Sequence, residues 1–78
     1  MSNGENNMNN NILVAERIRE LMQERGLNQV NLARQIGLKQ NTISSWLTKK
    51  KEPCINSLWI LADFFGVDVD FLIGRKEY

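Results

Sequence analysis

Four hydrogen-bonding side chains lie close together from residue 40 onward, and none of them carries a charge. Gln40 and Asn41 are adjacent amides, and Ser44 and Ser45 follow about one helical turn later. On a helix, residues three and four positions apart are neighbours on the surface. An amide pairs with two atoms on the major-groove edge of adenine, and a serine hydroxyl bonds several base edges. The four residues are therefore candidate contacts to the bases of double-stranded DNA.

Positive charge is concentrated in the same part of the chain. Between Glu24 and Glu52 there are six lysines and arginines and no acid, so this segment carries +6. The rest of the chain has four bases against nine acids, or −5, which leaves the net charge at +1. A nearly neutral protein whose positive charge is gathered in one segment can bind a polyanion there, although a solvated face is the commoner reason for a run of charge.

The residue types that most enzymes need are missing or isolated. The chain has no histidine and a single cysteine, Cys54, and its five glycines are scattered. No cluster of acids or cysteines has the spacing of metal ligands, and no glycine-rich loop could hold a phosphate. We therefore expect no enzyme activity, no metal, no cofactor and no small-molecule ligand.

The composition also indicates where the protein works. A lone cysteine without a secretory signal is typical of a reducing cytoplasm. No apolar run approaches the roughly 20 residues that span a bilayer. We expect a cytoplasmic protein without a membrane contact, in which Cys54 fills buried or half-buried space at the start of a helix.

The spacing of apolar residues predicts an all-α fold with five short helices. Residues 1–11 contain six asparagines, so we expect a disordered Asn-rich tail ahead of a folded domain over residues 12–78. Helical periodicity predicts helices over residues 12–25, 29–36, 40–48, 55–65 and 69–73, four of which are followed by glycine. The core stripe of the fourth helix is expected to be Ile55, Leu58, Leu61, Ala62 and Phe65.

The second and third predicted helices are joined by a very short turn. Ala33 is small enough for the third helix to cross close over the second, and Gly37 is free to take the positive φ that a sharp turn demands. Asn28 is expected to cap the second helix. The inward side of the pair is then formed by Leu32, Ile36, Leu38, Ile43 and Trp46. This arrangement leaves the side chains from Gln40 to Ser45 facing outward.

Four segments of the sequence resemble the Cro and phage-repressor type of helix-turn-helix domain, also called XRE-like. They are residues 17–29, 32–38, 42–46 and 61–72. The resemblance implies a lambda-repressor-like bundle of five helices that binds as a homodimer to a two-fold symmetric DNA operator, with the helix from Gln40 in the major groove. It also implies a bacterial or phage-encoded, nucleoid-associated transcriptional regulator, most simply a repressor.

The resemblance assigns DNA contacts to individual residues. The contacts to base edges would come from Gln40, Asn41, Ser44 and Ser45. Gln29 would contact a phosphate and brace Gln40. The other contacts to the DNA backbone would come from Lys39, Thr42, Thr48, Lys49 and Lys50. Two positions depart from the family pattern, which often has Ser or Thr in place of Lys39 and commonly has Gly in place of Lys49.

The fourth predicted helix is apolar on more than one side. In the family pattern, Ile60 and Phe71 occupy positions that are usually polar, and apolar surface beyond the core indicates a partner. We therefore expect a homodimer interface, against the alternative that these side chains fill the protein's own core. Its residues would be Trp59, Ile60, Phe64 and Phe71. The same surface is compatible with another function, that of a protein-interaction module such as an antitoxin or an adaptor.

Overall fold

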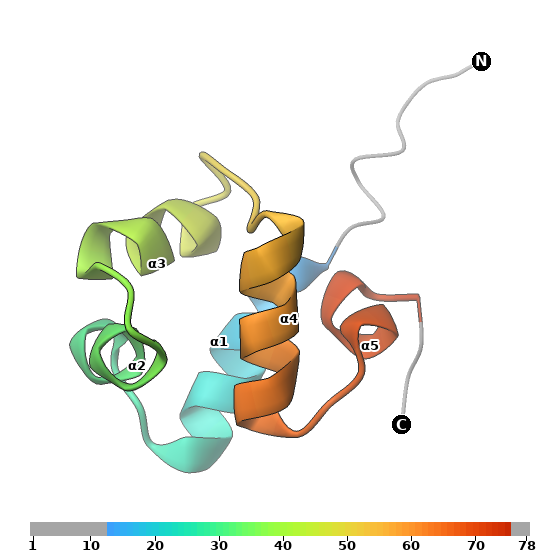
Figure 1. Ribbon diagram of the computed structural model, residues 1–78, viewed down its shortest axis with the longest axis horizontal. Helices are drawn as coiled ribbons and strands as arrows, with labels where there is room; N and C mark the ends of the chain where they lie inside the picture. The colour runs from blue at the N-terminus through green and yellow to red at the C-terminus, as the bar shows by residue number, and fades with distance from the viewer. Residues whose placement is uncertain (1–12, 76–78) are drawn as a thin grey trace.

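The computed structural model describes residues 13–75, which form five helices and no strand. The helices are α1 (Val14–Arg25), α2 (Gln29–Ile36), α3 (Gln40–Leu47), α4 (Ile55–Phe65) and α5 (Val69–Ile73) (Figure 1). The all-α fold with five short helices is confirmed, and the predicted bounds agree to within two residues. The predicted Asn-rich tail and Ile12, the predicted first helical residue, lie outside the described residues.

Each helix contributes one large side chain to the centre of the core. In Figure 1, α2 and α3 lie to one side of α4 and α5 to the other, while α1 packs against both α3 and α5. The five large side chains that are almost completely buried are Ile18, Leu32, Ile43, Leu61 and Leu72. Burial of each one stabilises the fold by roughly 1.5–3 kcal/mol. The short helices are therefore held together by shared burial rather than by their own length.

The starts of α2 and α3 are capped differently. Asn28 has extended backbone angles, and its side-chain oxygen accepts a hydrogen bond from the backbone N–H of Asn31 at 2.8 Å, which confirms the predicted cap. Lys39 occupies the corresponding position before α3 and supplies no side-chain cap. The free backbone N–H groups at the start of α3 therefore depend on other acceptors.

Three arginines of α1 bind backbone carbonyls at the ends of three other helices. Arg19 donates to the carbonyl of Leu47 in α3 at 3.3 Å, and Arg17 donates to that of Phe71 in α5 at 3.2 Å. Arg25 donates to two carbonyls of α4, those of Phe64 at 3.1 Å and Phe65 at 3.0 Å. The last carbonyls of a helix lack hydrogen-bond donors within the helix and carry partial negative charge. An arginine at that end supplies both a donor and a positive charge.

The aromatic residues are divided between the core and the surface. Trp46 is buried, as predicted, and Phe71 is also buried, with 7% of its surface exposed and the Arg17 guanidinium 4.7 Å from its ring centre. Phe71 therefore packs within its own chain, which is the alternative given above for these side chains, and its place in a homodimer interface stays an untested prediction. The prediction that Cys54 is buried or half-buried is wrong, since it lies exposed at the start of α4.

Candidate nucleic-acid interface

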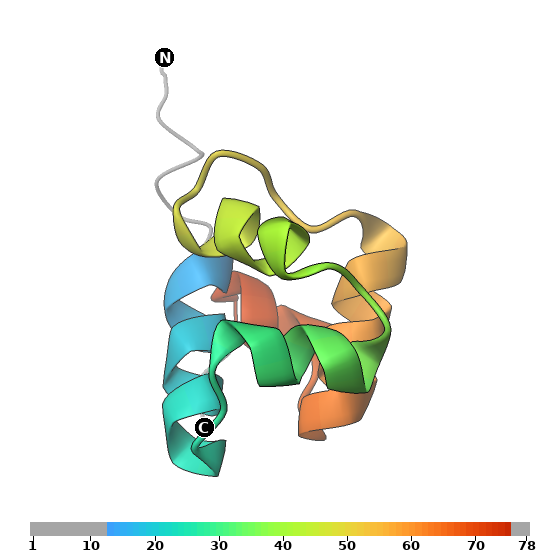
Figure 2. The same ribbon diagram turned by 90° about the vertical axis from the view of Figure 1, so that its left-hand side faces the viewer.

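The turn between α2 and α3 sets the orientation of the helix that carries the candidate base contacts. Gly37 has φ 76°, and the N–H of the following Leu38 donates to the carbonyl of Ala33 at 2.9 Å. Ala33 is buried, and α2 packs against α3. A side chain at position 37 would meet no neighbouring atom, so the requirement for glycine comes from its backbone conformation alone. Figure 2 shows α2 and α3 on the same side of the molecule, with α3 crossing above α2.

The two amides at the start of α3 are exposed, and one of them is held in place. The side-chain nitrogen of Gln40 donates to the side-chain oxygen of Gln29 at 2.8 Å, so Gln29 braces Gln40 as predicted. This bond uses one of the two N–H groups of Gln40 and leaves the other N–H and the oxygen unused by Gln29. Those two atoms are the pair that an adenine edge requires. Asn41 is exposed beside it.

The two serines are half-buried, and their surroundings differ from those of the amides. The hydroxyl of Ser45 donates to the carbonyl of Asn41 at 3.0 Å, so its oxygen remains as an acceptor. The hydroxyl of Thr48 donates to the carbonyl of Ser44 at 2.9 Å. An open hollow of about 330 Å³ runs along this side of α3 and is lined by Asn41, Ser44, Ser45, Thr48 and Lys50. The structure thus brings three of the predicted base contacts and two of the predicted backbone contacts around one depression.

The three consecutive lysines after α3 do not point the same way. Lys49 has φ 64°, and its ammonium lies 2.6 Å from a carboxylate oxygen of Glu16 in the first turn of α1. This hydrogen bond is the main cause that lowers the pKa of Glu16 below its usual value. Lys50 instead lines the hollow beside α3, and Lys51 lines a second one that also contains Asn41. Lys39 is exposed before α3 and Thr42 is half-buried in its first turn.

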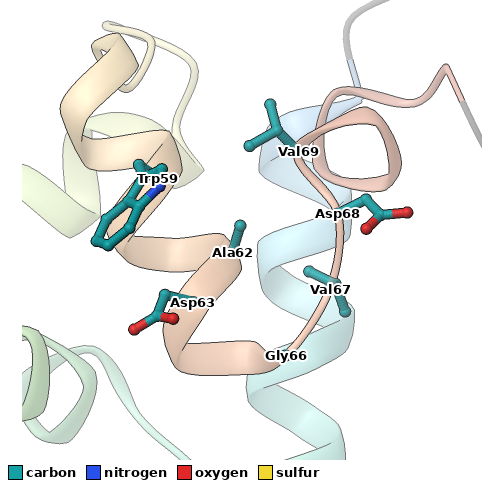
Figure 3. Close-up of a pocket in the computed structure, with 7 residues that line it drawn as sticks. All are labelled: Trp59, Ala62, Asp63, Gly66, Val67, Asp68 and Val69. Carbon is teal, nitrogen blue, oxygen red and sulfur yellow. The ribbon is translucent and has the colours of Figure 1, made fainter.

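A second exposed feature is an apolar stripe on α4. Trp59 is 64% exposed and, in Figure 3, lies on α4 across a shallow hollow from Val67 and Val69. Ile55 lies one turn before Trp59 and is 85% exposed, so its predicted place in the core is wrong. The spacing of four residues from Trp59 is the signal in the sequence that could have placed Ile55 on the outer side.

The remaining predicted interface residues are more covered than Trp59. Ile60 and Phe64 are half-buried. The Phe64 ring packs edge-on against Phe65, with 5.0 Å between the ring centres, and the Arg25 guanidinium lies 5.3 Å from each ring centre. Ile60 and Phe64 follow Trp59 by one and five residues, so they lie on a different side of α4 from Ile55 and Trp59. A second copy that covered the exposed stripe would therefore meet Trp59 and Ile55.

The described part of the chain has neither a metal site nor a membrane-spanning helix. Within residues 13–75, no three or more His, Cys, Asp or Glu side chains are grouped so that they could hold a metal ion. No helix in the same range has both the length and the apolar character needed to cross a membrane.

Comparison with known proteins gives several matches to one kind of domain. A family model described as helix-turn-helix matches residues 18–72. The phage CTXphi transcriptional repressor RstR of Vibrio cholerae is 32% identical over 65 residues, which are 83% of this chain and 59% of RstR. The uncharacterized regulator YobD of Bacillus subtilis (strain 168) is 29% identical over 65 residues, which are 83% of this chain and 58% of YobD.

Two further matches are to a longer protein that activates transcription and to a protein of known structure. The transcriptional activator BcrR of Enterococcus faecalis is 32% identical over 62 residues, which are 80% of this chain and 30% of BcrR. The crystal structure of a transcriptional regulator from Listeria innocua superposes with a TM-score of 0.74 at 26% identity, covering 83% of this chain and 61% of that one. In all four cases the chain spans less than two thirds of the length of the protein that it matches.

Proposed function

Because the chain belongs to the Cro/C1-type (XRE-like) helix-turn-helix family, we propose that it is a transcriptional regulator that binds double-stranded DNA in a sequence-specific manner. The observation that carries the proposal is the hydrogen bond between Gln40 and Gln29, since it fixes an exposed amide at the start of α3. A donor and acceptor held in advance lose less conformational entropy when they bind a base edge. The start of α3 would enter the major groove, as in other helix-turn-helix proteins.

The binding energy would come from two sources. Gln40 and Asn41 would provide discrimination between sequences, with Ser45 as an acceptor, and each good base contact is worth about 1–3 kcal/mol. Lys39, Lys50 and the start of α2 at Gln29 would contact phosphates, which provides affinity that does not depend on sequence and weakens as salt is added. No step in this function requires catalysis.

The mode of action follows from occupancy of a site on DNA. A protein bound at a promoter blocks polymerase, so repression in the bacterial cytoplasm is the simplest outcome, and RstR is a repressor. BcrR is an activator, so regulation of transcription is the more general statement. Since these relatives are named as transcriptional regulators, the alternative of an antitoxin or adaptor is not favoured.

We also propose that the protein binds as a homodimer to a two-fold symmetric site. The exposed Trp59 and Ile55 on α4 support this proposal, because they leave a contiguous apolar stripe that a second copy could cover. Half-sites would then be spaced by about one helical turn of DNA.

Selection of bound duplexes from a random library, followed by binding titrations at several salt concentrations, tests both proposals. We expect Gln40→Ala to reduce the preference for the selected sequence by about 5- to 150-fold, which corresponds to 1–3 kcal/mol, with little change in the salt dependence. Lys50→Ala should weaken binding to selected and scrambled duplexes alike. Gln23→Ala, which removes an exposed amide from the last turns of α1, is the matched control.

Two outcomes would contradict these proposals. A wild-type protein that binds selected and scrambled duplexes equally would exclude sequence-specific recognition. A stoichiometry of one chain for each symmetric duplex, measured by sedimentation, would exclude the homodimer.

A further inference from the structure

The first of the three lysines after α3 is directed away from the surface that the other two line. Its ammonium lies against Glu16 on α1, a residue 33 positions earlier in the sequence. Figure 2 shows the segment after α3 passing beside the start of α1, which brings the two side chains together. Lys50 and Lys51 form no ion pair with any of residues 13–75, and they line the hollows beside α3.

The backbone at Lys49 starts its side chain in the direction of α1. The residue has φ 64°, a left-handed conformation that is uncommon for any residue with a side chain. Its N–H donates to the carbonyl of Trp46 at 3.2 Å, and the N–H groups of Lys50 and Lys51 both donate to the carbonyl of Ser45, at 3.0 and 3.2 Å. These three bonds hold the chain in a tight turn around the end of α3, and Lys49 leaves that turn toward α1.

The ion pair changes the charge that a nearby phosphate would meet. The Lys49 and Glu16 side chains are 63% and 47% exposed, so the pair contributes little to folding. It nevertheless places a negative charge next to a positive one, well within the 8–10 Å over which charges act at ordinary salt. The Glu16 carboxylate is ionised at neutral pH, as an exposed glutamate ordinarily is, and the hydrogen bond from Lys49 lowers its pKa further. A phosphate beside α3 would therefore meet a nearly neutral pair instead of a lysine.

We propose that Glu16 limits the affinity of this protein for DNA by holding Lys49 in an ion pair, so that Lys49 does not contact a phosphate. This inference rests on the proposed DNA-binding function. Removal of the Glu16 charge frees the Lys49 ammonium to reach the DNA backbone at the end of α3. The effect is blind to sequence, because phosphate contacts contribute equally to all duplexes.

The test compares Glu16→Gln with Glu20→Gln in the full chain. Both variants remove one negative charge from the exposed side of α1. Glu20 lies one turn later and pairs weakly with Arg17 at 3.7 Å, but Arg17 remains held by the Phe71 carbonyl and ring and is not freed. The comparison therefore separates the release of Lys49 from the general effect of one unit of charge.

The affinity for selected and scrambled duplexes is measured between about 50 and 200 mM salt. We expect Glu16→Gln to bind both duplexes about two- to fivefold more tightly near 0.1 M salt, the range that the loss of an exposed ion pair can account for. The logarithmic salt dependence should steepen by about 0.9, the value for one added phosphate contact. Glu20→Gln should change both quantities much less. Lys49→Met should have a small effect in the wild type and should abolish the gain when it is combined with Glu16→Gln.

The outcomes separate this inference from the proposed function. If the wild type binds DNA but Glu16→Gln and Glu20→Gln behave alike, or if Lys49→Met leaves the gain intact, the inference is wrong and the function stands. If the wild type binds no duplex, both are wrong. A second measurement does not involve DNA: nuclear magnetic resonance titration of the Glu16 carboxyl should show a pKa below the ordinary value, which Lys49→Met should raise.

Discussion

The two ends of α3 use the same backbone conformation but hold it by different means. Gly37 before the helix and Lys49 after it both have positive φ, at 76° and 64°. At the start, glycine takes this conformation without strain, and the neighbouring Gln29–Gln40 bond joins two uncharged groups. At the end, a lysine takes it, and its side chain is tied to α1 by opposite charges.

The difference teaches which part of the candidate interface responds to solution conditions. The amides that would read bases are placed by backbone geometry and a neutral hydrogen bond, which depend little on salt or pH. The charge at the other end depends on an exposed ion pair that salt screens. The preference for one DNA sequence should therefore change little with salt or pH, whereas the overall affinity for DNA should change with salt.

Substitution of Gly37 tests the start of α3 and should have the largest effect. Gly37→Val forces a β-branched residue into a left-handed conformation, and we expect a loss of about 2 kcal/mol in the free energy of unfolding. Gly37→Asn should cost less than about 1 kcal/mol, because asparagine tolerates that conformation. Urea denaturation measures both. If Gly37→Val and Gly37→Asn lose the same free energy of unfolding, the left-handed backbone conformation is not the reason for glycine at this position.

The missing cap at Lys39 offers a way to strengthen the start of α3. Lys39→Ser adds a side-chain oxygen in reach of the first free N–H groups, and we expect it to be more stable than Lys39→Ala by about 1 kcal/mol. The alanine variant controls for the loss of charge and of the long side chain. Thermal denaturation of the two variants provides the comparison. If Lys39→Ser is no more stable than Lys39→Ala, the first backbone N–H groups of α3 already have other acceptors.

The smallest effect is expected at Lys49, where glycine and alanine variants both lose the ion pair. Lys49→Ala keeps a side chain at positive φ, while Lys49→Gly relieves that strain and adds flexibility to the unfolded chain. The strain exceeds the cost in entropy, so Lys49→Gly should be more stable than Lys49→Ala by about 0.5–1 kcal/mol. Chemical denaturation is again the measurement. The reverse order would mean that the left-handed conformation at position 49 carries no strain.

The sequence predicted what depends on local patterns. Helix bounds followed from apolar spacing and from glycines such as Gly37, and the burial of Trp46 followed from its helical phase with Ile43. The resemblance predicted the Gln29–Gln40 bond, which the structure contains. These features are fixed by residues within about a dozen positions of one another.

The features that were missed depend on contacts between distant segments. Phe71 is covered by Arg17, which is 54 residues away, and Lys49 is paired with Glu16 across 33 residues. A charged residue on an amphipathic helix is expected to face solvent, and nothing in its spacing reveals a carbonyl on another helix. Ile55 was misplaced for a simpler reason. It was assigned to the core stripe because it is apolar, but its side chain is exposed in the first turn of α4.

The hydrogen bonds from α1 to the far ends of α3, α4 and α5 have a consequence for how the domain opens. A helix frays at its ends, and in α3, α4 and α5 the last turn is held by hydrogen bonds from arginines of α1. Loosening any of these ends requires the release of a charged hydrogen bond from α1. We therefore expect the domain to open in one cooperative step, with α1 as the element on which the ends of α3, α4 and α5 depend.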